Sequence, residues 1–121
     1  MSKYKIIFVD DEFITLKMFQ MEFGERYDVV TASNGDEALK LIGSDPGIQI
    51  MFTDYKMPKL SGVELIKKAL ALNPKLKCSI VTGYASLPEI EDLLNSNDKV
   101  DVLDKPINLS KIEGVIEAEF G

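Results

Sequence analysis

Short apolar runs alternate with stretches of helical spacing along the whole chain, and this alternation limits the folds that it can adopt. An apolar run of about five residues is typical of a buried strand in a parallel sheet, which needs a helical connection to the next strand. The chain holds five such repeats. The pattern predicts an α/β fold in which helices cover both faces of a five-stranded parallel sheet.

The positions of the predicted elements follow from the same pattern. Strands are expected at residues 6–9, 27–32, 48–53, 78–82 and 100–103. Helical stretches are expected at residues 14–23, 38–42, 63–72, 88–94 and 109–120, and the apolar stripe of the first begins at Ile14. Gly24 is expected to end the first helix, and Asn34 or Asp36 to cap the second. We assign three methionines to core packing, Met18, Met21 and Met57.

Length and composition limit the chemistry of the chain. A chain of 121 residues, of which 45% are hydrophobic and 28% charged, can bury a core without disulfides or structural zinc, so residues 1–121 are predicted to form a single domain. The lone Cys78 cannot form an internal disulfide, and the sequence contains no histidine. This composition excludes Ser-His-Asp and Cys-His hydrolases, imidazole zinc sites and phosphohistidine carriers.

The charge of the chain argues against nucleic-acid binding. Acidic residues outnumber basic ones by 20 to 14, which gives a net charge of −6, and Arg26 is the only arginine. Phosphate backbones are held by clusters of Lys and Arg, so direct nucleic-acid binding is not expected. The first residues show no signal-peptide pattern and no apolar run approaches about 18 residues, so we expect a cytoplasmic protein without membrane insertion.

Polar and charged side chains gather where the predicted strands end. Four strand ends carry them, namely Asp10 with Asp11, Asp54, Thr82, and Asp104 with Lys105. In an open parallel sheet, ligands bind beyond the carboxyl ends of the strands, at the point where the strand order reverses. These side chains are therefore predicted to meet at one edge of the sheet.

Three carboxylates at one site repel one another. Two unit charges about 4 Å apart repel by roughly 4 kcal/mol at an effective dielectric constant of about 20. Either one carboxylate is protonated or a cation lies among them, and oxygen ligands favour Mg²⁺. Mg²⁺ and Lys105 around an exposed carboxylate would stabilise a phosphoryl group during transfer and activate an aspartate as the nucleophile, giving an aspartyl phosphate.

Five sequence elements carry a family resemblance that spans essentially the whole chain. They are residues 8–12 (FVDDE), residues 53–58 (TDYKMP), Gly62, residues 81–85 (VTGYA) and residues 104–106 (DKP). Together, and in this order, they resemble the receiver domain of two-component response regulators. The resemblance implies a flavodoxin-like, doubly wound sheet of strand order 2-1-3-4-5 with five helices.

The resemblance also implies a set of metal ligands and an acceptor. Asp54 would be the phosphoacceptor and, with Asp11, a direct ligand of Mg²⁺. Asp10 would help to hold the ion through water, and the backbone carbonyl of Lys56 would complete the protein's contribution. The resemblance therefore makes Mg²⁺ the cofactor of this chain.

Further roles follow from the same resemblance. Thr82 would hydrogen-bond the phosphoryl oxygens, and Lys105 would pair with another of them. The peptide bond between Lys105 and Pro106 is expected to be cis. Gly62 would give the loop after Asp54 a conformation that a side chain would hinder.

One departure from the family concerns the switch. Val102 stands three residues before Lys105, where many receivers carry Tyr or Phe. Rotation of an aromatic ring is therefore not expected, and the activation signal would travel through the loop that contains Gly83 and Tyr84. We hypothesise that Tyr84 and the side chain of Lys56 set the aspartyl-phosphate lifetime by hindering or admitting the attacking water.

Each of these residues also has a purely structural interpretation. An Asp pair after a strand is more often a helix cap or a solvated loop, and Glu12 beside it is interpreted as a solvated neighbour. Thr82 and Lys105, taken alone, are ordinary strand-end residues. Only the joint placement of these residues favours a site.

Competing functions are separated by the same residues. The first interpretation is a receiver that takes a phosphoryl group from a histidine kinase or phosphotransfer domain onto Asp54, catalyses only its own phosphorylation and dephosphorylation, and then binds an effector. The alternative is a receiver-like interaction module without a phosphorylation switch. A flavodoxin-type cofactor binder is excluded because Asp10, Asp11 and Glu12 would repel a phosphate. A hydrolase of the haloacid dehalogenase type would need Asp-x-Asp after its first strand and a larger chain.

The output surface is expected on the fourth helix, the fifth strand and the fifth helix. That last helix has no arginine to complete the charged dimer interface of many DNA-binding regulators. We therefore do not predict that dimer.

Overall fold

The computed structural model describes residues 4–120. Its strands are β1 (Lys5–Val9), β2 (Asp28–Ala32), β3 (Ile48–Asp54), β4 (Lys77–Thr82) and β5 (Val100–Asp104). Its helices are α1 (Phe13–Phe23), α2 (Gly35–Ser44), α3 (Gly62–Leu72), α4 (Pro88–Ser96) and α5 (Leu109–Phe120). Every predicted element is present, and the ends differ from the prediction by a few residues at most. Within the described part of the chain, no helix is long and apolar enough to cross a membrane.

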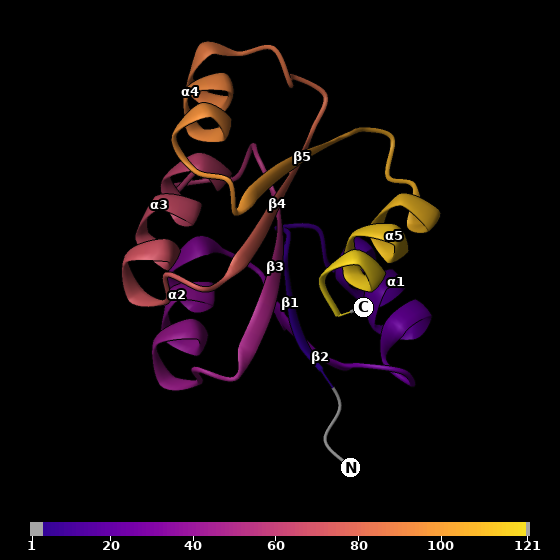
Figure 1. The fold of residues 1–121 in the computed structure, drawn as a ribbon. Helices are drawn as coiled ribbons and strands as arrows, with labels where there is room; N and C mark the ends of the chain where they lie inside the picture. The colour runs from indigo at the N-terminus through magenta and orange to yellow at the C-terminus, as the bar shows by residue number, and fades with distance from the viewer. Residues whose placement is uncertain (1–3, 121) are drawn as a thin grey trace.

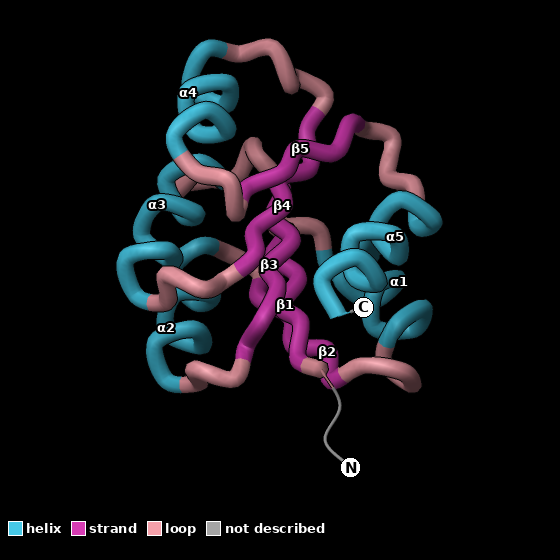
Figure 2. The backbone as a smooth tube through the Cα atoms, in the orientation of Figure 1, coloured by secondary structure: helices cyan, strands magenta, loops and turns pink. Residues whose placement is uncertain are grey.

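The strands form one parallel sheet in the order β2-β1-β3-β4-β5. Helices α1 and α5 lie on one face, and α2, α3 and α4 lie on the other (Figure 1). Figure 2 shows the sheet nearly edge-on between these two layers. The predicted flavodoxin-like, doubly wound fold is confirmed. The strand order reverses at β1, which pairs with both β2 and β3, so the carboxyl ends of β1 and β3 lie side by side.

The core consists of two clusters, one on each face of the sheet. Successive strand residues point to opposite faces, so Ile7 packs toward α2, α3 and α4 while Phe8 packs toward α1 and α5. The Phe8 ring stacks on Phe19 of α1 at a centroid distance of 4.3 Å and on Phe52 of β3 at 5.1 Å. Each cluster packs against one face of the sheet, so the strands are covered on both faces.

Helix α1 buries fewer residues than predicted. Its buried residues are Leu16, Phe19 and Phe23. Ile14 is 82% exposed and Met21 is 74% exposed, so the prediction that they belong to the core is wrong. Each lies two positions from a buried residue, which places it about 200° around the helix and on the solvent side. Met18 is partly buried against the core and Met57 is buried, as predicted.

The helix ends follow the capping residues of the sequence. Asn34, rather than Asp36, caps α2, because its side chain accepts the backbone N–H of Glu37 at 2.8 Å. The backbone N–H of Gly24 donates to the carbonyl of Gln20 at 2.9 Å, and α1 ends there as predicted. These caps define where each helix begins or ends relative to the sheet.

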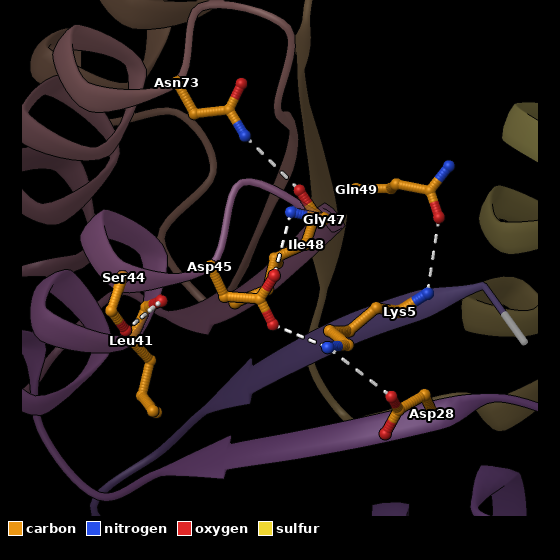
Figure 3. Close-up of polar contacts among 9 residues, drawn as sticks. All are labelled: Lys5, Asp28, Leu41, Ser44, Asp45, Gly47, Ile48, Gln49 and Asn73. Carbon is orange, nitrogen blue, oxygen red and sulfur yellow. Dashed lines mark hydrogen bonds and ion pairs between the residues drawn. The ribbon is translucent and has the colours of Figure 1, made fainter. Parts of the chain in front are cut away.

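Charged and polar contacts join neighbouring segments at the edge of the sheet where the strands begin (Figure 3). The ammonium of Lys5 lies 2.6 Å from Asp45 and 3.6 Å from Asp28. The hydrogen bond to Lys5 lowers the pKa of Asp45, and the same bond raises the pKa of Lys5. The side chain of Asn73 donates to the carbonyl of Ile48 at 3.3 Å. These contacts join β1, β2 and the start of β3 at the edge of the sheet opposite Asp54.

The first and last described residues meet at that same edge. Tyr4, just before β1, stacks its ring on Phe120 at the end of α5, with a centroid distance of 3.9 Å and an interplanar angle of 8°. An ion pair between Arg26 and Glu113 joins the turn after α1 to α5. Helix α5 is thus held to the fold from both its apolar face and its charged flank.

Candidate functional site

Three aspartates meet beyond the carboxyl ends of β1 and β3. One carboxylate oxygen from each of Asp10, Asp11 and Asp54 lies within 4.8 Å of the other two. Asp10 is 5% exposed and Asp54 is 7% exposed, whereas Asp11 is open to solvent. Asp54 is the last residue of β3, and the backbone N–H of Asp10 donates to the carbonyl of Ala32 at the end of β2. The strand order therefore brings the predicted carboxylates together.

Lys105 reaches this cluster from the end of β5. Its ammonium lies 2.9 Å from a carboxylate oxygen of Asp54, and its backbone N–H donates to the carbonyl of Thr82 at 2.9 Å. Burial alone would lower the pKa of Lys105, but the hydrogen bond and charge of Asp54, with the charge of Asp10, raise it. The peptide bond from Lys105 to Pro106 is cis, as expected. The lysine is therefore held as a cation against Asp54.

Asp10 shows how strongly the cluster favours a positive charge. Burial raises the pKa of Asp10 to about 6. The backbone N–H of Glu12, 2.9 Å from its carboxylate, acts in the opposite direction, and the negative charges of Asp54 and Asp11 add to the rise. A set of carboxylate oxygens, with neither imidazole nor thiolate, fits a hard divalent cation such as Mg²⁺.

Thr82 ends β4 beside the same cleft and is 1% exposed. Its hydroxyl oxygen accepts the backbone N–H of Tyr84 at 2.9 Å, which leaves the hydroxyl hydrogen free to donate elsewhere. One cleft is lined by Asp11, Glu12, Asp54, Lys56, Thr82, Gly83, Tyr84 and Lys105. The structure thus places the predicted acceptor, threonine and lysine around a single space.

Lys56 and Tyr84 form the exposed part of the cleft wall. The Lys56 ammonium lies 6.0 Å from the centroid of the Tyr84 ring, a cation–π contact across the opening. Tyr84 is 54% exposed. Both residues line the cleft that also holds Asp54 and Lys105.

Gly62 closes the loop that follows Asp54. A Cβ at this position would lie 2.4 Å from the carbonyl oxygen of Asp54 and 3.0 Å from the Cα of Tyr55. The Gly62 N–H donates to the Tyr55 carbonyl at 2.7 Å. The expected hindrance therefore arises from the close approach of two backbone segments.

Other sequence candidates lie outside the cleft or at its rim. Asp104 is exposed at the end of β5 and does not line the cleft. Glu12 is exposed at its rim and precedes α1. Val102 lies partly buried on the face of α2, α3 and α4. The chemistry is therefore concentrated at the ends of β1, β3, β4 and β5.

The sequence reasoning missed two contacts of the loop after Asp54. The hydroxyl of Tyr55 donates to the carboxylate of Glu89 in the first turn of α4. Leu60 lies against Gly35 at the start of α2. No local signal reveals either contact, because each partner comes from a different helix and lies far away in the sequence.

Comparisons with known proteins identify the family of this chain. The response regulator receiver domain family matches residues 6–117. The chain is 32% identical over 91 residues to the response regulator receiver protein CpdR of Brucella abortus, covering 75% of this chain and 74% of CpdR. It is 27% identical over 117 residues to the response regulator protein PilR of Pseudomonas aeruginosa, covering 96% of this chain and 26% of PilR. The chain thus spans about a quarter of the length of PilR.

A solved structure shows the same fold at comparable identity. A CheY-like response regulator receiver domain protein from Methanospirillum hungatei superposes with a TM-score of 0.83 at 32% identity. The superposition covers 98% of this chain and 97% of that chain. By sequence and fold, this chain belongs to the response regulator receiver domain family of two-component signalling.

Proposed function

We propose that Asp54 accepts a phosphoryl group from the phosphohistidine of a histidine kinase or phosphotransfer domain and that this modification switches the binding of an effector. One observation carries the proposal. Asp54 is buried between two further carboxylates within 4.8 Å and the ammonium of Lys105 at 2.9 Å. Positive charge on one side and a cation-binding carboxylate cluster on the other suit the transfer of a charged phosphoryl group.

The reaction uses few groups of this chain. A carboxylate oxygen of Asp54 attacks the phosphorus atom, so that a P–O bond forms while the P–N bond of the donor breaks and its electron pair returns to the donor imidazole. Asp11, Asp54 and the carbonyl of Lys56 would hold Mg²⁺, with Asp10 acting through water. Bound there, the ion supplies positive charge that offsets the charge of the phosphoryl oxygens. The domain catalyses only its own phosphorylation and dephosphorylation.

Thr82 and Lys105 respond to the new group. Lys105, already paired with Asp54, pairs with a phosphoryl oxygen, and the free hydroxyl hydrogen of Thr82 donates to another. Because the Thr82 hydroxyl also accepts the N–H of Tyr84, a shift of Thr82 changes the loop that leads into α4. With Val102 at the usual aromatic position, we propose that Gly83 and Tyr84 carry the signal.

The partners follow from the family and from the surface of the domain. A kinase or phosphotransfer domain supplies the phosphoryl group, and an effector binds the face made by α4, β5 and α5. The first turn of α4 carries Glu89 and Glu91, and the chain has a net charge of −6. Because this negative charge repels phosphate groups, the direct partner is an effector protein or domain and not a nucleic acid. We place this activity in the cytoplasm, within one domain over residues 1–121.

Phosphorylation by a small donor tests the proposal directly. The protein is incubated with acetyl phosphate and Mg²⁺, and its intact mass is recorded beside an EDTA control. We expect a single labile phosphoryl adduct that disappears in Asp54→Asn and persists in Asp98→Asn, an exposed residue before β5. An adduct that survives in Asp54→Asn would refute the assignment of the acceptor. Failure to form an adduct, together with failure to bind beryllofluoride, would favour an interaction module without a phosphorylation switch.

A further inference from the structure

The loop between β3 and α3 lies against the first residue of α2. A Cβ added at Gly35 would come 2.5 Å from Cδ2, 3.0 Å from Cβ and 3.1 Å from Cγ of Leu60. A rotation of the Leu60 side chain moves Cδ2, but the position of its Cβ is set by the backbone. A side chain at Gly35 therefore requires Leu60 to rotate away and the loop or α2 to shift by a few tenths of an ångström.

The loop has little freedom to absorb such a displacement. Lys59 has φ of 69°, a left-handed conformation that residues with a Cβ seldom adopt. The N–H of Leu60 donates to the carbonyl of Pro58 at 2.8 Å, and the N–H of Gly62 donates to Tyr55 at 2.7 Å. The loop is thus a closed turn, and a shift at Leu60 is passed along it.

This loop carries a residue of the proposed metal site. Lys56 supplies the backbone carbonyl that would bind Mg²⁺, four residues before Leu60. Asp11 lines the groove that separates α2 from the loop, together with Gly35, Lys59 and Leu60. The contact between Leu60 and Gly35 therefore lines the same groove as Asp11, and it lies four residues along the chain from Lys56.

We propose that Gly35 is a positioning residue for the Mg²⁺ site: by lacking a side chain it lets Leu60 rest on α2, which keeps in place the loop that carries the Lys56 carbonyl. This inference rests on the proposed function, because it assumes that the site binds Mg²⁺. Gly35 itself contacts neither the ion nor the phosphoryl group.

Titration with Mg²⁺ alone, followed by the backbone amide NMR signals of the folded protein, tests the inference. Gly35→Ala is expected to weaken Mg²⁺ binding about tenfold, as for other residues that support metal ligands. Gly43→Ala is the matched control on the same helix, because a Cβ there would meet only Leu72 Cδ1 at 3.9 Å. Its Mg²⁺ affinity should equal that of the wild type.

A compensating variant separates positioning from simple loss of stability. Leu60→Gly removes Cδ2, Cγ and Cβ, the three atoms that the new methyl group would meet, so Gly35→Ala/Leu60→Gly should bind Mg²⁺ more tightly than the sum of the two single losses predicts. If Gly35→Ala alone does not fold, the double variant should bind Mg²⁺ about as tightly as the Leu60 single variant does, and weaker binding would overturn the inference. Additive losses in this cycle would overturn the inference. So would a Gly35→Ala protein that binds Mg²⁺ normally and is merely easier to unfold in urea.

The same titration distinguishes failure of the inference from failure of the proposed function. A wild-type protein that does not bind Mg²⁺ would overturn the proposed metal site and this inference with it. Normal Mg²⁺ binding by the wild type and by Gly35→Ala alike would overturn the role of Gly35 and leave the acceptor role of Asp54 intact.

Discussion

The buried carboxylate of Asp10 lowers the stability of the fold when it is charged. Burial raises its pKa from 3.8 to about 6, so the folded protein holds a proton at Asp10 more tightly than the unfolded chain does. The stability associated with protonated Asp10 is fully present below the unfolded pKa of 3.8 and is lost as the pH rises through about 6. Near neutral pH, the metal-free fold therefore carries a buried negative charge that a cation would relieve.

Asp10→Asn should stabilise the metal-free protein at about pH 8 by about 1–3 kcal/mol, since a shift of one pKa unit corresponds to about 1.4 kcal/mol. The amide oxygen can still accept the N–H of Glu12. Urea unfolding of wild type and variant measures the difference, which should shrink at about pH 4. Asp98→Asn, at an exposed position, should show no such gain. An equal gain at both pH values would contradict the explanation.

Tyr84 and Lys56 should control how fast the aspartyl phosphate hydrolyses. Tyr84→Ala opens the exposed wall of the cleft and is expected to raise the dephosphorylation rate about three- to tenfold, or about 1 kcal/mol in the barrier. Lys56→Ala removes the cation over the ring and should also change the rate. The decay of the mass adduct after removal of donor measures both. Tyr84→Phe keeps the ring and should behave as wild type, whereas unchanged rates in both Ala variants would contradict the hypothesis.

At the scale of elements, α3 begins where the loop from Asp54 ends, and a reciprocal cap fixes that point. The N–H of Glu64 donates to the Ser61 hydroxyl at 3.2 Å, and the N–H of Ser61 donates to the Glu64 carboxylate at 3.2 Å. Both orphan donors at the helix start are thereby satisfied. The cap contributes to the position of the loop as well as to the stability of the helix.

Ser61→Ala should lower the free energy of unfolding by about 1 kcal/mol, because a backbone N–H at the start of α3 loses its acceptor. Glu64→Ala should cost less, and the double variant should cost less than the sum, since each residue caps the other. Urea denaturation of the four proteins measures the cycle. Ser110→Ala, in the exposed first turn of α5, is the control and should be neutral. Strict additivity would count against a reciprocal cap.

Which elements form could be predicted from the sequence, because apolar runs and helical stripes report burial directly. The face of α1 was less predictable. Ile14 and Met21 are apolar yet exposed, since an apolar side chain outside the stripe of Leu16 and Phe19 has no core to join. Hydrophobicity alone does not say on which side of a helix the sheet lies.

The meeting of the site carboxylates was also predictable from topology. Asp10, Asp11 and Asp54 each follow the buried part of a strand, and parallel neighbours end at the same edge. The contacts of Tyr55 with Glu89 and of Leu60 with Gly35 were not predictable, because they depend on how closely α4 and α2 approach the loop. Periodicity does not determine those distances.

In the whole molecule, the sheet separates two apolar clusters, and strands β1 and β3 contribute buried side chains to both. Ile66 of α3 belongs to the cluster under α2, α3 and α4, and Ile112 of α5 belongs to the cluster under α1 and α5. Their side chains do not share a cluster, yet both depend on the same strands. The domain should therefore unfold as one cooperative unit.

Ile66→Val and Ile112→Val should each lower the free energy of unfolding by about 0.5–1.5 kcal/mol, since each deletes one buried methylene group. Because the sheet lies between the two sites, the double variant should equal the sum within about 0.5 kcal/mol. Urea unfolding followed by circular dichroism and by tyrosine fluorescence should give one coincident transition in all four proteins. Separate transitions for the two probes would contradict a single cooperative unit.

The stacked rings of Tyr4 and Phe120 bring the first and last described residues of the chain side by side. A short bridge could join the two ends, because neighbouring chain ends are what permit a domain to be permuted or inserted into another chain. Tyr4 and Phe120 lie at the edge of the sheet where β1 begins, and Asp54 lies at the opposite edge, where β3 ends. A reporter or a second domain fused next to Tyr4 or Phe120 would therefore lie on the side of the sheet opposite Asp54. The phosphoryl donor could still reach Asp54.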